Sequence, residues 1–539
     1  MRVDGMGYLA GWGFTDIFMN MFCNFRRSAG LLHTLAGVPL SLVLFIVFLT
    51  GSITYFRMEI ALWMQPELHR AQKGTQGFDR VFSLLQKHAE KTEKLSIYLP
   101  GARRNTIYAW WFEPKSDTRP QRQICFMHFD PVSGEQVTPR KSNNGNLFYR
   151  MHYRLHGVGS AGAFLVNIAA MAMFIALITG VIIHKTVIRD FFTFRPGKGR
   201  LSWRDTHTTT GMLALPFYFV LCFSGLLLVC WFYFPDAITS RYRDGIRTFY
   251  KEAFLQTELE QKHLPQASAE NRLGVSLKQL LTETAKYWPD EMAERITLLK
   301  DEEGHPNIEI HQAMGKNINY RNDMNSLVFD GVTGALLAVK TPKKPSAIIA
   351  MWNTMYSLHV GRFASPLPRF LLFFSGLLGS LMFASGLILW ASRYQLPKST
   401  NKYSVPFTIV SIANMTILSG LVIAIGVYFW SNRLLPTAME SRDEWEVHVF
   451  SIGWAITLLH ALLRRPHSKA WKEQFFAAGL LFSLIPLLNG LTGGAHLGQS
   501  IPNRLWIVAG FDLVALFFGV VFFAISMQPK EIKNAVQEK

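Results

Sequence analysis

Long apolar runs alternate with polar segments along this chain of 539 residues. Eight runs approach or exceed the length of about 20 residues that a helix needs to cross a hydrocarbon layer. The sixth run is the shortest. We predict transmembrane helices over 31–56, 157–184, 208–234, 367–391, 404–430, 447–463, 472–490 and 505–527, of which the last four form a C-terminal four-helix membrane region at 404–527.

Two polar segments, 57–150 and 235–352, are long enough to be water-soluble domains. Each ends near a common signature, FDPVSG in the first and FDGVTG in the second, after alternating apolar residues. Asp and Gly supply the backbone conformations of tight turns, so this signature predicts strand, turn and strand in both segments. We therefore expect two similar domains with turns at Asp130–Gly134 and Asp330–Gly334.

Basic residues gather in alternate loops between the predicted spans. Short loops that stay in the cytoplasm carry the excess of Lys and Arg, which places the segment 1–30, the loop 185–207 and the tail 528–539 inside the cell. The polar segments then lie in the periplasm, and the chain is a multi-pass protein of a bacterial inner membrane with both termini cytoplasmic. The basic cytoplasmic loops, which also include those after the fourth and sixth spans, largely explain the formal net charge of +18, so no nucleic-acid partner is expected.

Histidines recur at matching positions in the two halves of this arrangement. His33 begins HTLAG before the first polar segment, and His207 begins HTTTG before the second. After the polar segments come LHGVG, which contains His156, and LHVG, which contains His359. A unit of span, domain and span therefore occurs twice, as in an internal duplication.

The same segments resemble the PepSY-associated transmembrane protein family, which includes iron-regulated membrane reductases for ferric siderophores. The resemblance covers roughly 26–393, and its carriers are LHTLAG from Leu32, FYRMHYRLHG from Phe148, HKTVIRDFFTFRPGKGRLSWRDTHTTTG from His184 and YSLHVGRF ending at Phe363. It implies an α-helical membrane protein of about eight spans with two α+β PepSY-like domains, each a helix packed on an antiparallel sheet.

A parallel duplication places matching residues at one depth on opposite sides of an axis along the membrane normal. We therefore expect His33 to face His207 near the cytoplasmic surface, and His156 to face His359 near the periplasmic surface. Two imidazoles opposed at one depth are what a six-coordinate haem b requires, so we predict two haem b groups. His184 is the alternative inner ligand.

Neighbouring residues qualify this prediction. His152, one turn before His156, is the alternative outer ligand or a substrate contact. Gly37 and Gly211, one turn from their histidines, leave room for a flat macrocycle, although small residues also let membrane helices approach closely. His156 and His184 are separated by about 42 Å of helix, so haems at the two surfaces would lie far apart for direct electron transfer.

The chain has no GxGxxG motif after a strand, no Walker loop and no nucleophile elbow. Electrons are therefore expected from a separate cytoplasmic donor or from quinol. The resemblance implies a ferric siderophore or other ferric chelate as the acceptor, and its reduction releases iron because siderophores bind Fe(II) far less well. Side chains that suit an anionic or planar ligand are Arg103, Arg104, Trp110, Trp111, Arg321 and Trp352.

Two other functions fit the pattern. The chain is alternatively a non-enzymatic PepSY protein that binds a periplasmic partner, with purely structural histidines, or a reductase or transport component for copper or another metal. The colour of the purified protein separates the structural alternative from a haem protein.

Overall fold

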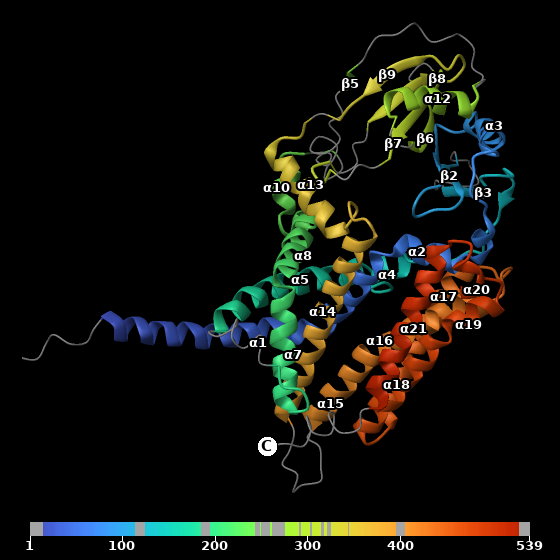
Figure 1. Cartoon of the computed structure of the whole chain (residues 1–539). Helices are drawn as coiled ribbons and strands as arrows, with labels where there is room; N and C mark the ends of the chain where they lie inside the picture. Colours follow the sequence, from blue (N-terminus) through green and yellow to red (C-terminus); the bar gives the residue numbers. More distant parts are fainter. Residues whose placement is uncertain are drawn as a thin grey trace, which may run out of the picture.

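The computed structural model describes residues 14–113, 124–184, 194–242, 248, 259–260, 275–289, 293–301, 304–313, 317–320, 325–342, 344–394 and 405–527. It has a bundle of long helices on one side and a β-sheet on the other (Figure 1). We call the end of the bundle nearer the sheet the sheet side, and the opposite end the far side.

Among the described residues, seven helical stretches are long and apolar enough to cross a membrane. They are α1 (Phe14–Thr54, apolar from Phe25), α5 (Gly159–Ile183), α14 (Pro366–Ala391), the continuous α15 (Val405–Asn414), η4 (Met415–Ser419) and α16 (Gly420–Leu434), α17 (Arg442–Leu463), α18 with α19 (His467–Ser483 and Ile485–Leu491), and α21 (Trp506–Met527). An eighth candidate is a bent pair of helices, α7 (Arg200–Leu213) and α8 (Leu215–Leu228). Each run predicted from hydropathy overlaps one of these stretches.

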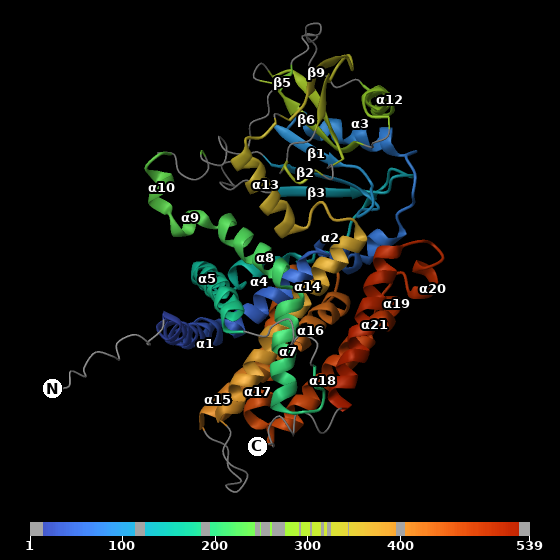
Figure 2. The ribbon, with the colours of Figure 1, turned by 60° about the vertical axis from the view of Figure 1, so that its left-hand side comes forward.

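The bend between α7 and α8 measures 67° and has a local cause. Pro216 lies in the first turn of α8 and has no N–H group to donate to the preceding turn, so the helix breaks at Ala214. In Figure 2, α7 runs along α14, whereas α8 leans away from it. The break therefore changes the direction of the chain between the far side and the sheet side.

The polar segments form one continuous sheet rather than two separate ones. The strand order is β4-β3-β2-β1-β6-β7-β8-β9-β5, and β1 pairs antiparallel with β6 from Lys94↔Leu299 to Tyr98↔Arg295. The first segment supplies α3 (Phe78–Ala89), β1 (Lys94–Tyr98), β2 (Ile107–Phe112), β3 (Ile124–Phe129) and β4 (Gln136–Val137). The second supplies β5 (Leu259–Glu260), α12 (Leu277–Tyr287), β6 (Ala293–Lys300), β7 (Pro306–Gln312), β8 (Ser326–Asp330) and β9 (Leu336–Lys340).

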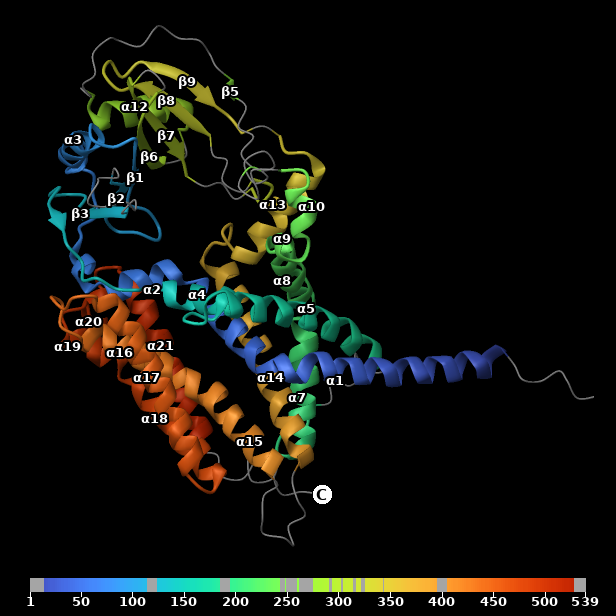
Figure 3. The ribbon, with the colours of Figure 1, turned by 180° about the vertical axis from the view of Figure 1, so that it is seen from behind.

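Alternation along the strands puts apolar side chains on one face of this sheet. There they pack against α3 and α12, which cover the face that points away from the membrane helices (Figures 1 and 3). In β2, for example, Ile107, Ala109 and Trp111 are buried, whereas Phe112 is exposed on the opposite face. The opposite, open face is the side of the sheet turned toward the bundle.

The turns predicted from FDPVSG and FDGVTG are confirmed, and their hydrogen bonds match. Asp130 Oδ1 accepts from the backbone N–H groups of Val132 and Ser133, both at 2.8 Å. Asp330 Oδ1 accepts in the same way from the two residues at the equivalent positions, at 2.9 and 2.7 Å. Gly134 and Gly334 follow with φ of +68° and +72°, a left-handed conformation that Gly adopts without steric cost.

The C-terminal helices are fastened to the sheet-side loops by buried ionic groups. Arg442 and Glu446, both fully buried in α17, form an ion pair with an N···O distance of 2.6 Å. Arg442 also donates to the carbonyls of Lys141 and Asn432, and Glu446 accepts from Ser142 at 2.8 Å. The loop after β4 is thereby held against α16 and α17.

Replacing Arg442 with Met is expected to reduce the free energy of unfolding by about 3–5 kcal/mol, because the substitution leaves a buried carboxylate without its cation. Thermal unfolding of the detergent-purified protein measures this as a large fall in the midpoint. The matched control is Arg464→Met, which removes a guanidinium from an exposed pair with Glu473 and should leave the midpoint nearly unchanged. Equal midpoints for the two variants would contradict this account.

Candidate functional site

Four histidines lie in two pairs between the helices that flank the sheet segments. His33, in α1, and His207, in α7, have ring centroids 6.4 Å apart and ring planes at 78°. These two imidazoles, which we call the far-side pair, lie within a few residues of the far ends of α5 and α14. The pairing expected from the repeated HTxxG segments is the one that the structure brings together.

The second pair, the sheet-side pair, comes from two short helices that follow the sheet segments, α4 (Asn146–Arg154) and α13 (Ala347–Val360). Its members are His152 and His359, with ring centroids 5.9 Å apart and ring planes at 43°. The sequence pattern favours His156 as the outer ligand and gives His152 only as its alternative. His156 follows the end of α4 and is not the imidazole that lies against His359.

Each paired imidazole is held through its Nδ1 atom. The acceptors are backbone carbonyls on neighbouring helices: Ala176 for His33 at 2.9 Å, Met382 for His207 at 2.8 Å and Val47 for His152 at 2.9 Å. A carbonyl oxygen cannot donate, so Nδ1 must carry the proton in these three rings, and the lone pair then lies on Nε2. A neutral imidazole with Nδ1–H fixed by an acceptor is the form that binds a metal through Nε2.

His359 is held in the same way by α8. Its Nδ1 lies 2.9 Å from Ser224 Oγ and is also hydrogen-bonded to the backbone of Leu221. Burial, and then the neighbouring His152, lower the pKa of His359 to about 3. Burial also lowers the pKa of His152. Both rings are therefore neutral at physiological pH, as a ligand must be.

Each imidazole also packs against a glycine. A Cβ atom built on Gly51 would lie 2.5 Å from His152, and one built on Gly386 would lie 3.1 Å from His207. On Gly180 it would lie 3.3 Å from His33, and on Gly225 it would lie 3.3 Å from His359. Any larger side chain at Gly51 would force the imidazole of His152 to move, so the absence of a side chain is part of how the ring is positioned.

The carbonyl that accepts from each imidazole and the glycine that contacts it belong to one sequence motif, which occurs four times. The motif is VFLTG at 47–51, ALITG at 176–180, LCFSG at 221–225 and MFASG at 382–386. Its first residue supplies the carbonyl acceptor, its fourth is Ser or Thr, and its fifth is the glycine. All four hydroxyls donate to that same first carbonyl, with distances from 2.9 to 3.5 Å. Sequence reasoning missed these residues, although the repetition of hydrophobic-x-x-Ser/Thr-Gly was visible.

The repeated motif also sets the spacing between the two pairs. On α1, 14 residues separate His33 from Val47, which holds His152, and on α7 and α8 the same number separates His207 from Leu221. Fourteen residues of helix measure about 21 Å. The pairs are therefore about half as far apart as the 42 Å estimated from His156 and His184.

Each of the two pairs could supply the two protein ligands of a haem iron. A metal–imidazole bond of about 2.0 Å on each side separates the two coordinating nitrogens by about 4 Å and the ring centroids by about 6 Å. The observed 6.4 and 5.9 Å agree with this arrangement. In the part of the chain that the structure describes, no group of three or more His, Cys, Asp or Glu side chains could hold a metal ion. Two protein ligands suffice where a macrocycle supplies the other four nitrogens.

The remaining predicted cofactor residues lie near the far-side pair. His184 is exposed at the C-terminal end of α5, one turn beyond the glycine that contacts His33. A Cβ atom on Gly37 would meet nothing within 4 Å, whereas one on Gly211 would lie 3.2 Å from Met382 Sδ. Gly37 therefore borders open space, but neither glycine contacts a paired imidazole.

The predicted substrate residues do not form a single surface. Trp111 is buried against α3 and α12, on the face of the sheet opposite Trp110. Arg103 is held by Glu59, with an N···O distance of 2.6 Å. Arg321 lies outside the described residues, and Trp352 is half-buried in α13.

Arg104 and Trp110 do share the open face. The guanidinium of Arg104 lies over the rings of Tyr98 and Tyr108, with its carbon 4.8 and 5.5 Å from their centroids. Trp110 pairs across the strands with Phe126, which is exposed. The open face thus carries a cation stacked on aromatic rings beside exposed aromatic side chains.

Comparison with known families identifies the region that contains the site. A protein-family model described as the PepSY-associated TM region matches residues 31–393. The match includes all four paired histidines and ends before α15, so the C-terminal helices lie outside it. No protein with a curated description matches the chain. With its long apolar helices, the chain is a multi-pass membrane protein.

Proposed function

Because this chain belongs to the PepSY-associated transmembrane family, we propose that it is a haem-b-containing reductase that passes electrons across a membrane to ferric chelates on the sheet side. Ferric siderophores are the proposed acceptors. The observation that carries the proposal is the set of four imidazoles in two facing pairs, each with Nδ1 held by a hydrogen bond so that Nε2 can bind a metal.

His33 and His207 would hold one haem b, and His152 and His359 the other. When bound, haem b supplies reversible one-electron transfer. The protein contributes the orientation of each ring, because the first carbonyl of the repeated motif holds the ring and the glycine of the same motif lies against it.

The membrane is the bacterial inner membrane, with both termini in the cytoplasm and the sheet in the periplasm. This orientation rests on the basic residues of alternate loops, such as Arg26 and Arg27 before the first span. With haem b bound, the far-side pair would take electrons from a cytoplasmic donor or from quinol, and the sheet-side pair would deliver them to the chelate. The substrate iron gains one electron and passes from Fe(III) to Fe(II), which the chelate holds less tightly.

An internal duplication accounts for the two pairs. Helix α1, the first sheet segment, α4 and α5 correspond in order to α7 with α8, the second sheet segment, α13 and α14. The matching turns at Asp130 and Asp330 and the fourfold motif support this correspondence. Each half supplies one ligand to each pair, so neither half alone would hold a haem.

Reduction across a vesicle membrane tests this function. Vesicles that contain the purified protein and an enclosed, impermeant reductant should form Fe(II) from an external ferric siderophore, and an external Fe(II) indicator measures its rate. His207→Ala should reduce that rate to the level of protein-free vesicles. Equal rates for this variant and the wild-type protein would rule out electron transfer through the far-side pair.

A further inference from the structure

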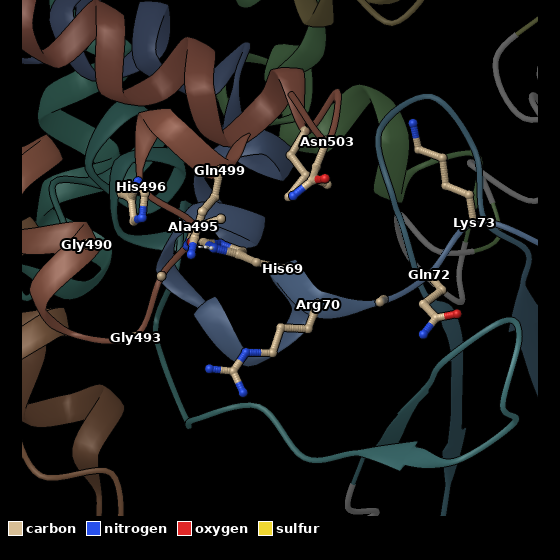
Figure 4. A pocket seen from close by; sticks show the side chains of 13 residues that line it. His69, Arg70, Gln72, Lys73, Gly490, Gly493, Ala495, His496, Gln499 and Asn503 are labelled. Atoms are coloured by element: carbon tan, nitrogen blue, oxygen red, sulfur yellow. Dashed lines mark hydrogen bonds between the residues drawn. The ribbon is translucent and has the colours of Figure 1, made fainter. Parts of the chain in front are cut away.

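A cavity of about 700 Å³ lies outside the site described above, on the sheet side. One wall is the chain that leaves η1 (Pro66–Arg70), with Arg70 and Lys73. The facing wall is the corner between α19 and α21, which includes α20 (Leu497–Ser500) and carries His496 and Gln499 (Figure 4). The cavity therefore lies between the region that the family model matches and the C-terminal helices.

The side chains around this cavity favour an anion. Arg70 and Lys73 are exposed cations, and Gln72, Gln499 and Asn503 offer amide N–H groups. None of the described residues that line the cavity is acidic. Its volume falls within the range of small-molecule sites, but its lining is rich in polar side chains, which suits a charged group rather than an apolar one.

The floor of the cavity is formed by a buried side chain, His69. His69, 4 % exposed, accepts from the backbone N–H of Ala495 at 3.2 Å through Nδ1 and donates to the Leu62 carbonyl at 2.9 Å through Nε2. Both ring nitrogens are used, so His69 holds η1 against the C-terminal corner. Burial, and then the charge of Arg433, lower the pKa of His69 to about 4.

Behind this floor lies a buried cation with spare donors. Arg433 is 5 % exposed and donates to Asn489 Oδ1 at 2.8 Å, and Asn489 in turn donates to the Ala495 carbonyl at 3.1 Å. Within the described structure, Nε and Nη1 of Arg433 have no hydrogen-bond partner. The nearby carboxylate of Asp512 is engaged by Trp63 and Asn489. The buried guanidinium, partly balanced by Asp512 and Glu67, places a third positive charge near the exposed cations of the cavity.

The cavity borders the beginning of a helix that is apolar enough to span a membrane. Leu505, which lines it, precedes Trp506, the first residue of α21, and Trp506 is 63 % exposed. Exposed tryptophans at the ends of spans lie at the membrane–water boundary. We propose that this pocket binds a phosphate group, carried either by an anionic phospholipid headgroup or by a soluble phosphate ester.

Binding to the full-length protein in detergent tests the proposal. Native mass spectrometry measures phosphatidylglycerol against phosphatidylcholine, and calorimetry measures glycerol 3-phosphate as the soluble probe. Arg70→Gln with Lys73→Gln should weaken binding at least about tenfold, since two charge-assisted contacts are lost. Gln499→Trp, which fills the cavity without changing its charge, should do the same.

The matched control is Lys87→Gln with Lys91→Gln, which removes two exposed charges from the same polar segment, away from the cavity. If phosphatidylglycerol binds to the control but to neither pocket variant, the cavity is a headgroup site. The same pattern with glycerol 3-phosphate alone identifies a soluble ligand. The proposal is overturned if neither probe binds, if the control loses binding equally, or if Gln499→Trp leaves binding unchanged.

Discussion

Replacing His359 with Ala is expected to remove one of two haem equivalents and to abolish reduction of an external ferric chelate. The substitution deletes one Nε2 ligand of the sheet-side pair and leaves the far-side pair intact. His152→Ala should have the same effect, because the two rings face each other at 5.9 Å. Haem extraction and the absorption spectrum of the purified variants measure the loss, and the remaining haem shows that the protein has folded.

His156→Ala is the matched control for this experiment. It removes a histidine from the same segment, four residues beyond His152, but not from the pair. We expect its haem content and its rate of chelate reduction to equal those of the wild-type protein. Loss of haem from His156→Ala, with full haem in His152→Ala, would reverse the assignment.

Gly51→Ala is expected to lower the haem content nearly as much as His359→Ala does, although it removes no histidine. The new Cβ would lie 2.5 Å from Nδ1 of His152, so the ring must shift and lose its hydrogen bond to the Val47 carbonyl. A displaced ring no longer faces His359 at the distance that two axial ligands require. Quantification of haem should show the loss of most of one equivalent.

Two comparisons make this glycine test specific. Gly30→Ala places the same methyl group in the same helix where nothing lies within 4 Å, and it should retain both haems. Gly180→Ala, where the contact with His33 is 3.3 Å, should produce a smaller loss from the far-side pair. If Gly51→Ala retains both haems, close contact with glycine does not position the ligand.

The sequence predicted that His33 faces His207 because each histidine begins a segment of the same spacing, HTxxG, and the structure brings the two rings together. The sheet-side pair was harder to predict, because the LHG and LHV segments look alike although their histidines, His156 and His359, occupy different positions relative to the helix end. Leu155, with φ of +47°, ends α4 before His156, whereas His359 precedes Gly361, the residue that ends α13. Local similarity therefore matched a residue outside a helix to one inside it.

The joined sheet could not be predicted from the strand pattern. Alternating apolar residues identify strands and the face that they bury, but they do not determine which edge strand pairs with which. Here β1 and β6, nearly 200 residues apart in the sequence, pair along five residues of register. Similarly, hydropathy predicted a span over 208–234 but not its break at Ala214, which depends on Pro216.

The two ligand pairs are the central claim, and haem quantification combined with spectroscopy of the full-length protein tests them most directly. We predict two haem b groups per chain, both low-spin and six-coordinate, with one lost in His152→Ala or His359→Ala and the other in His33→Ala or His207→Ala. A colourless protein from haem-replete cells, or haem that survives intact in all four variants, would contradict the account.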